Sequence, residues 1–232
     1  KRLASLGQRY LLEKSEERFR SKTTKEIFTE IYQQQLWGTS DEGFNSGPGT
    51  HDRELSEVYI NAVNMWLEKV SEKLIAVDLG CGDFHIGSQL VSKFKAYIGC
   101  DIVNELILRN RKKFKFANLE FQQLDLTKDK LPDGDVVFLR QVLQHLSNDL
   151  IIKSIRKIEL KYKYLILTEH IPHQEEYIKN IDKPSGWLTR INLGSAVDIT
   201  KAPFDFKYKN RTELCAVSHG GGIVQTLLYE TG

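Results

Sequence analysis

From residue 74 onward, short apolar runs alternate with longer segments in which apolar residues recur every three or four positions. Strands that are apolar on both faces and separated by helices are typical of a parallel sheet covered on both sides. The predicted strands are 74–79, 96–101, 119–124, 135–139 and 164–168. The predicted helices among them are 86–94, 104–114 and 149–160. Ser147 and Asn148 are available as N-caps for the last helix.

The C-terminal end departs from this alternation. Residues 184–203 form an irregular insertion, after which segments 213–218 and 223–230 flank His219-Gly220-Gly221-Gly222. Two strands around a glycine-rich turn predict an antiparallel hairpin. The predicted fold class is therefore α/β, with a doubly wound, Rossmann-like and mostly parallel seven-stranded sheet that ends in an antiparallel β-hairpin.

The residues before the first strand have a different character. Residues 1 to about 36 are rich in Glu, Lys, Arg and Gln, with apolar residues at helical spacing, which indicates a polar helical segment. Residues 37–50 contain Gly, Ser, Thr and Pro and predict a loop. A long helix is expected at about 55–72, where apolar residues again recur at helical spacing.

Three of the predicted strands end in a carboxylate. Asp78 is followed by Gly80-Cys81-Gly82, Asp101-Ile102 ends the second strand, and Asp125-Leu126 follows the third. In an open α/β sheet, ligands bind beyond the carboxyl ends of the strands, where glycines allow a tight turn and a carboxylate accepts from a ribose. Each acid taken alone can equally be a helix cap. The three in succession predict an adenosine-binding crevice.

The first turn lacks the third glycine of a dinucleotide fingerprint. Phe84 and His85 stand where that glycine is expected, and glycine returns only at Gly87. A pyrophosphate needs access to a helix N-terminus, and we expect Phe84 and His85 to crowd that position and Asp83 to repel phosphate. A cationic adenosine ligand without phosphate is favoured, and S-adenosylmethionine has these properties.

The segment Val77-Asp78-Leu79-Gly80-Cys81-Gly82 resembles the first motif of the class I S-adenosylmethionine-dependent methyltransferases. Asp101 resembles the ribose-binding acid of that family, Asp125-Leu126 its adenine-contacting pair, and the terminal hairpin its usual ending. The resemblance covers about residues 55–232 and implies S-adenosyl-L-methionine as cofactor and S-adenosyl-L-homocysteine as product. The cofactor-binding residues that it implies are Asp78, Gly80, Cys81, Gly82, Asp101, Ile102, Asp125, Leu126 and Arg140.

Trp37-Gly38, followed by Ser46-Gly47-Pro48-Gly49-Thr50, resembles the N-terminal segment of bacterial methyltransferases linked to surface polysaccharides and small metabolites. The resemblance implies a lid that folds over the cofactor; the alternative is a surface Ω-loop. We expect two parts: an N-terminal helical segment with a glycine-rich lid loop at 1–54, and a cofactor-binding domain at 55–232. Within that domain an insertion at about 170–212, which contains Trp187 and Arg190, is expected to form the acceptor pocket.

Methyl transfer to an alcohol requires a group that removes the acceptor proton. The candidates are His145, Glu169 and His170, which follow the fourth and fifth predicted strands. A histidine near its ordinary pKa can act as a base at neutral pH, although His145 can instead pack or cap a helix end. A divalent ion held by Glu169, His170 and Asp135 is an alternative that we do not favour, and no metal ligand is predicted.

Composition narrows the choice of partner and compartment. The formal net charge of +2 is too small to indicate nucleic-acid binding, and no apolar run is long enough to span a membrane. No signal peptide is recognisable, and three cysteines without metal-type spacing suggest a reduced, cytoplasmic protein. We expect transfer to an oxygen, or alternatively a nitrogen, of a small molecule or saccharide. An NAD(P)-type oxidoreductase and a non-catalytic adenosine-binding protein remain the alternatives.

Overall fold

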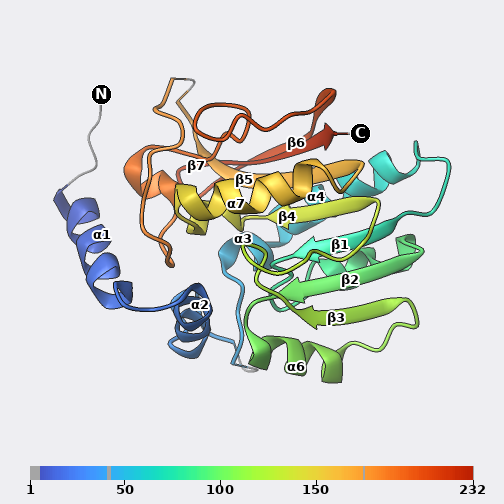
Figure 1. Cartoon of the computed structure of the whole chain (residues 1–232), viewed down its shortest axis with the longest axis horizontal. Coiled ribbons are helices and arrows are strands. Elements are labelled where there is room, and N and C mark those ends of the chain that lie inside the picture. The colour runs from blue at the N-terminus through green and yellow to red at the C-terminus, as the bar shows by residue number, and fades with distance from the viewer. Residues whose placement is uncertain (1–5, 41–42, 175, 232) are drawn as a thin grey trace.

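The computed structural model describes residues 6–40, 43–174 and 176–231, which contain one seven-stranded sheet. Its strands are β1 (Ile75–Leu79), β2 (Ala96–Asp101), β3 (Leu119–Gln123), β4 (Val136–Arg140), β5 (Tyr164–Pro172), β6 (Asn210–His219) and β7 (Gly222–Glu230). Their order is β3-β2-β1-β4-β5-β7-β6, and β7 runs opposite to the other six strands (Figure 1). The predicted fold class, a mostly parallel sheet with a C-terminal hairpin, is confirmed.

The strand order locates the point where the winding reverses. The chain builds β1, β2 and β3 toward one edge and then returns to place β4 on the other side of β1. Loops that leave β1 and β4 therefore diverge, and a crevice opens between them at the carboxyl ends of the strands. This crevice is where the sequence motifs that follow β1, β2 and β3 converge.

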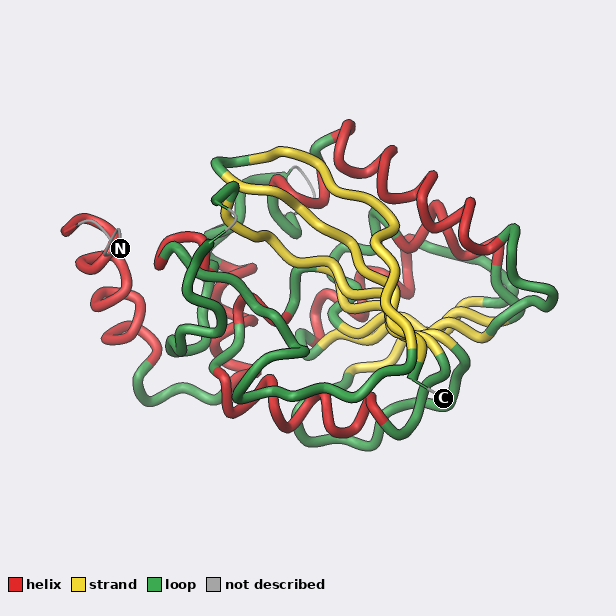
Figure 2. Tube along the Cα trace, turned by 90° about the horizontal axis from the view of Figure 1, so that it is seen from above, coloured by secondary structure: helices red, strands yellow, loops and turns green. Residues whose placement is uncertain are grey.

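Helices cover both faces of the sheet, as Figure 2 shows from above. They are α4 (Arg53–Leu67), α5 (Gly87–Leu90), α6 (Asn104–Lys113) and α7 (Asn148–Glu159), with short 3₁₀ turns η1 (Val91–Lys93), η2 (Leu143–His145) and η3 (Arg190–Leu193). Side chains of α4 and α5 pack in one apolar cluster, and those of α7 pack in another on the opposite face. The central strands β1 and β4 are therefore buried on both faces, as the apolar strands predict.

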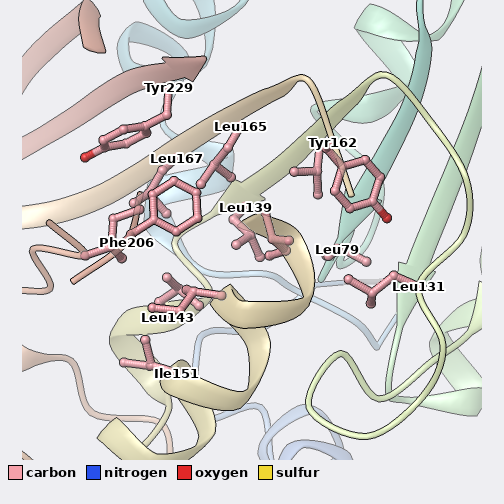
Figure 3. Close-up of a cluster of buried hydrophobic side chains, with 14 of the residues drawn as sticks. Leu79, Leu131, Leu139, Leu143, Ile151, Tyr162, Leu165, Leu167, Phe206 and Tyr229 are labelled. Carbon is pink, nitrogen blue, oxygen red and sulfur yellow. The ribbon is translucent and has the colours of Figure 1, made fainter. Parts of the chain in front are cut away.

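Successive side chains of β4 point to opposite faces of the sheet and so join different clusters. Val137 and Leu139 join the cluster with Ile151 of α7, whereas Val136 and Phe138 join the cluster on the α4 face. Figure 3 shows Leu139, Leu143 and Ile151 packed together below the sheet strands. Burying a side chain of this size contributes about 1.5–3 kcal/mol, so the strands that carry the site are held from both sides.

The N-terminal segment forms two helices where the sequence predicts one helical stretch. They are α1 (Leu6–Phe19) and α2 (Thr24–Gln33). Thr23 and Glu26 form a reciprocal capping box that starts α2 and separates it from α1. The expected loop at 37–50 holds one further short helix, α3 (Pro48–His51), because Gly47 turns with a φ of +90° and Pro48 occupies the first helical position.

The fifth strand and the hairpin are longer than predicted. β5 continues to Pro172 because each added residue pairs with β7, up to Pro172 opposite Gly222. Gly220 and Gly221 both have positive φ, 52° and 78°, which fits a two-residue turn whose twist matches that of the flanking strands. The sequence pattern stops earlier because His170 and Pro172 are atypical strand residues.

Candidate active site

A cavity of about 300 Å³ lies beyond the carboxyl ends of the parallel strands. Its walls include the turn after β1, the ends of β2 and β4, the loop after β3, and residues of the N-terminal segment from Thr24 to Thr50. All the residues predicted to bind the cofactor line this cavity: Asp78, Gly80, Cys81, Gly82, Asp101, Ile102, Asp125, Leu126 and Arg140. The volume is at the lower end of the range for small-molecule sites.

The glycines after β1 allow a ligand, or another segment of this chain, to approach the backbone closely. Gly80 and Gly82 have φ angles of +80° and +56°, which favour glycine. A Cβ at Gly80 would lie 2.6 Å from Val142 Cγ2, and one at Gly82 would lie 2.3 Å from Ser46 Oγ. The Gly80 and Cys81 amides both donate to Cys100 O, at 2.8 and 2.9 Å, so the turn is fixed against β2.

Asp101 ends β2 within the cavity wall. Its two carboxyl oxygens accept from the amides of Gly82 and Val103, at 3.1 and 3.0 Å. Burial raises the pKa of Asp101 to about 6, against the opposing effect of these amide hydrogen bonds. The carboxyl group thus joins the turn after β1 to the loop after β2.

Asp78 and Arg140 line the cavity together with the turn at Gly80–Gly82. Burial raises the pKa of Asp78 to about 7, although the Tyr97 hydroxyl donates to its carboxyl at 2.9 Å. Arg140 lies over the ring of Tyr59, 5.1 Å from its centroid, and donates to Gly49 O of the N-terminal segment. Arg140 Nε is buried and has no hydrogen-bond partner among the described residues. A free donor of a buried cation next to the glycine turn fits a ligand that carries a carboxylate.

Asp125 is already engaged by its own loop. One carboxyl oxygen accepts from both the amide and the hydroxyl of Thr127, at 2.9 and 2.6 Å. The other oxygen lies 3.6 Å from Lys128 Nζ. This Asx-type turn orients the loop that carries Leu126 into the cavity wall.

The expected blockage by Phe84 and His85 is wrong. Phe84 is fully buried in the core, with φ +62°, and its ring packs edge-on against Tyr97, Phe114 and Phe121. A Cβ at Gly87 would lie 2.3 Å from the Phe84 ring, so the late glycine accommodates this buried ring. Neither Phe84 nor His85 lines the cavity.

Asp83 also has a role that the sequence does not reveal. Its carboxyl accepts from the Ser46 amide at 2.9 Å and lies 2.7 Å from His51 Nε2, while Ser46 Oγ accepts from the Asp83 amide at 2.8 Å. Burial alone would raise the pKa of Asp83, but hydrogen bonds from His51 and from backbone amides lower it below its ordinary value. Asp83 thus anchors the N-terminal segment to the turn after β1, and does not face a phosphate site.

The three catalytic candidates are placed differently. His145 and His170 line the cavity, whereas Glu169 lies on the other face of β5 and lines a separate cleft. Burial raises the pKa of Glu169 to about 8, and its carboxyl faces the Leu143 and Gln144 amides without a hydrogen bond of ordinary geometry. Glu169 therefore does not fit the role of a base in this cavity.

Both cavity histidines have a ring nitrogen held by a backbone carbonyl. His145 Nδ1 lies 3.2 Å from Gly186 O, and His170 Nε2 lies 2.9 Å from His219 O. A carbonyl only accepts, so each of these nitrogens carries a proton and the other nitrogen keeps its lone pair. Burial lowers the pKa of His145 to about 3 and lowers that of His170 as well. Both rings are neutral at pH 7.

The alternative metal site is not assembled. Asp135 lies at the opposite end of β4 from the cavity, where its carboxyl accepts from the Ile75 amide at 2.7 Å. Among residues 6–40, 43–174 and 176–231, no group of three or more His, Cys, Asp or Glu side chains is arranged to hold a metal ion. The same residues contain no helix long and apolar enough to cross a membrane.

The two insertion residues have unequal positions. Trp187 lines the cavity, and its carbonyl accepts from Trp37 Nε1 at 3.2 Å. Arg190 is fully buried, does not line the cavity, and donates to backbone carbonyls, among them Leu143 O and Leu146 O. The residues that sequence reasoning missed include Tyr32, Phe28 and His219, which come from the N-terminal segment and the hairpin. The glycine-rich 46–50 stretch is the sequence signal that pointed to that segment.

Comparisons with known proteins agree with this geometry. A family model described as "Methyltransferase domain" matches residues 71–216. No curated protein matches the chain. The family match favours a methyltransferase over an oxidoreductase of the NAD(P) type.

Solved structures share the fold at low sequence identity. Human N-acetylserotonin methyltransferase in complex with S-adenosylmethionine is 16% identical with a TM-score of 0.57; the match covers 94% of this chain and 62% of that one. The N-methyltransferase NodS from Bradyrhizobium japonicum WM9, with S-adenosyl-L-homocysteine, is 10% identical with a TM-score of 0.63, covering 89% and 100%. Magnesium protoporphyrin IX methyltransferase from Synechocystis PCC 6803, with S-adenosylmethionine, is 16% identical with a TM-score of 0.62, covering 91% and 99%.

Proposed function

Because the chain belongs to the methyltransferase-domain family, we propose that it moves a methyl group from S-adenosylmethionine to an oxygen of a small molecule or saccharide. The single observation that carries the oxygen assignment is His170, a neutral cavity histidine with one ring nitrogen left to accept a proton. A hydroxyl acceptor loses a proton during the transfer, and a nearby neutral imidazole can take it.

The cofactor is S-adenosylmethionine, and residues on three sides of the cavity fit its three parts. Asp101 and Ile102 suit the ribose, Asp125 and Leu126 suit the adenine, and Gly80, Cys81 and Gly82 allow close approach of the backbone. Asp78 and the unpartnered Nε of Arg140 suit the amino and carboxylate groups of the methionine part. When bound, the sulfonium supplies an electrophilic methyl group.

In the proposed mechanism, the chain orients the acceptor and removes its proton. The acceptor oxygen forms the new bond to the methyl carbon as the carbon–sulfur bond breaks, and the hydroxyl proton passes to Nδ1 of His170. The hydrogen bond between Nε2 of His170 and His219 O keeps the ring in the tautomer that leaves Nδ1 open. His145 serves the same purpose less well, because a pKa of about 3 makes it a weak base at neutral pH.

We further propose that residues 1–54 act as a lid on the domain formed by 55–232. Ser46 exchanges two hydrogen bonds with Asp83, Tyr32 and Ser46 hydroxyls lie 3.1 Å apart, and Arg140 donates to Gly49 O. These contacts would close the cofactor end from water, which methyl transfer requires. The three free cysteines and the small net charge support a cytoplasmic protein that acts on small acceptors and not on nucleic acid.

The proposal is tested with His170→Asn and the exposed His173→Asn as matched control. Calorimetry with S-adenosylmethionine, S-adenosylhomocysteine and NAD checks the cofactor, and release of S-adenosylhomocysteine from an acceptor panel checks transfer. We expect binding of both sulfur ligands but not of NAD, and a fall in kcat of roughly 10²- to 10⁴-fold for His170→Asn alone. An unchanged kcat in that variant would remove His170 from the mechanism, and tight NAD binding without either sulfur ligand would overturn the proposed function.

A further inference from the structure

The cavity has a second end that the cofactor residues do not occupy. Adenosine-binding groups gather over β1, β2 and β3, and Arg140 at the end of β4 interacts with Asp78 beside them, whereas the end over β5 and η2 is closed by the N-terminal segment, the insertion and the hairpin. An acceptor must enter on this second side. Six residues define what it meets there: Phe28, Trp37, His145, His170, Trp187 and Thr189.

None of the six residues that define this acceptor end is a carboxylate, a lysine or an arginine. The carboxylates and the arginine of the cavity wall are Asp78, Asp101, Asp125 and Arg140, and all four are among the residues that we assign to the cofactor. His145, which is buried, and His170, which is half-buried, are neutral, because desolvation lowers the pKa of each. Asp52 does not line the cavity, but its carboxyl group lies 3.8 Å from Nδ1 of the lining residue His219.

The nearest cations are directed away from the acceptor. Arg190 donates to Leu143 O at 3.1 Å and to Leu146 O at 2.9 Å, on the far side of the wall. Lys183 is buried, and its Nζ lies 3.5 Å from His145 O. Neither side chain lines the cavity. Since their donors face backbone carbonyls, they offer no counter-charge to a phosphate or carboxylate.

Aromatic rings supply the contact surface instead. Trp37 and Trp187 are joined by the bond from Trp37 Nε1 to Trp187 O, and the Trp37 ring lies 4.9 Å from the His145 ring. Both tryptophans are only partly buried and line the cavity. Aromatic faces of this kind pack against rings and leave the hydroxyl groups of a ring free for hydrogen bonding.

We propose that the methyl acceptor is an uncharged ring-bearing alcohol, a neutral sugar or a phenol, that packs against Trp37 and Trp187. This inference rests on the proposed function and specifies its substrate class. An acceptor with a phosphate or carboxylate on the reacting ring would lose its hydration without gaining a partner. A single neutral ring therefore enters, and any charged part of a larger molecule stays outside the cavity.

The test uses matched acceptors that differ in charge. One arm compares methyl glucoside with methyl glucuronide and with the 6-phosphate of the glucoside; a second arm compares catechol with 3,4-dihydroxybenzoate. Quenching of tryptophan fluorescence in the presence of S-adenosylhomocysteine reports binding independently of turnover, and S-adenosylhomocysteine release reports kcat/KM. We expect the neutral member of one arm to exceed its charged counterparts roughly tenfold or more in both readouts, and the arm that responds identifies sugar or phenol.

Two pairs of variants test the proposed acceptor site further. Thr189→Lys places a cation in the acceptor wall and should raise the relative kcat/KM for the charged acceptors at least about threefold, whereas Thr189→Gln, its uncharged control, should not. Trp187→Leu should weaken neutral-ring binding, and Trp187→Phe should restore most of it. Equal or better use of charged acceptors by the wild type, or no binding of any neutral ring, would overturn this inference. Loss of cofactor binding would instead overturn the proposed function.

Discussion

The two ends of the cavity differ in the buried charged groups that bond the backbone around them, although Arg140, which donates to Gly49 O, is a cation among the cofactor residues. At the cofactor end, buried carboxylates accept from backbone amides: Asp101 from Gly82 and Val103, and Asp83 from Ser46. At the acceptor end, buried cations donate to backbone carbonyls, as Arg190 does to Leu143 O and Leu146 O. The first arrangement leaves the Asp101 carboxyl group in the cavity wall, and the second leaves no carboxylate, lysine or arginine among the six residues of the acceptor end. The difference separates a surface suited to adenosine hydroxyls from one suited to a neutral acceptor.

The structure of the acceptor end depends more heavily on one residue, Arg190. We therefore expect Arg190→Met to lower the free energy of unfolding more than any other substitution considered below. Arg190 also donates to Ile181 O at 3.2 Å and to Asn148 Oδ1 at 2.8 Å, so it joins η2, α7 and the insertion. Replacing it leaves several buried acceptors without donors, and we expect the free energy of unfolding to fall by about 3–5 kcal/mol. Denaturant unfolding of the variant and the wild type measures this difference.

Arg156→Met is the matched control, because Arg156 is partly exposed and donates to the single carbonyl of Phe204. Its loss should cost about 1 kcal/mol. If Arg190→Met were no more destabilising than Arg156→Met, the acceptor wall would not depend on the buried guanidinium. Arg190→Lys should fall between wild type and Arg190→Met, since an ammonium cannot reach as many carbonyls as the planar guanidinium.

The second effect is a pH dependence that originates at Glu169. Burial raises its pKa to about 8 in the folded protein, from 4.5, so the folded state retains a proton that the unfolded chain releases. The contribution of Glu169 to the free energy of unfolding should therefore be constant below pH 4.5, become more unfavourable as pH rises from there to about 8, and then stay level. Glu169→Gln removes this loss and should be more stable than wild type at pH 9, by an amount on the order of 3 kcal/mol.

Unfolding free energies of both proteins between pH 4 and 9 provide the measurement. Glu72→Gln, at an exposed position, is the control and should follow the wild-type profile. A Glu169→Gln profile parallel to that of the wild type would mean that Glu169 is ionised in the folded protein. In that case a cation must pair with it, and Arg190 would be the neighbour to examine.

The cofactor end could be predicted from the sequence because its residues lie at strand ends. Apolar runs gave β2 at 96–101, and the parallel order then brings Asp78, Asp101 and the 125–126 pair to one edge. Phe84 was misinterpreted because its left-handed φ turns the ring into the core, and only the late Gly87 hints at this. No local pattern distinguishes a buried ring from one that faces a ligand.

The acceptor end could not be predicted in the same way. Arg190 donates to Leu143 O in η2, 47 residues away, and to Leu146 O just after η2, 44 residues away. Between β5 and β6, the regular structure of residues 173–174 and 176–209 is limited to the 3₁₀ turn η3. Glu169 and His170 are neighbours in sequence, yet strand alternation sends them to opposite faces of β5. The sequence showed that both follow the apolar part of the strand, but not that β5 continues through Pro172.

The smallest of the three effects concerns the cofactor end. Asp101→Asn keeps the shape of the side chain but replaces one accepting oxygen with a donor that faces the Gly82 or Val103 amide. We expect S-adenosylhomocysteine to bind roughly 10- to 150-fold more weakly, which corresponds to about 1.5–3 kcal/mol for lost hydrogen bonds to a charged group. Isothermal titration at pH 8, above the Asp101 pKa of about 6, compares the two proteins in defined ionisation states.

Asp125→Asn is the matched comparison at the same end. Asp125 bonds its own loop through Thr127, so its substitution should weaken the ligand less than that of Asp101. Acceptor binding measured by tryptophan quenching should change little in either variant, because no hydrogen bond joins Asp101 or Asp125 to Trp37 or Trp187, whose own hydrogen bond is to each other. Equal losses of cofactor and acceptor binding in Asp101→Asn would mean that the two ends are coupled through the turn at Gly80–Gly82, and that their different buried groups do not make them independent.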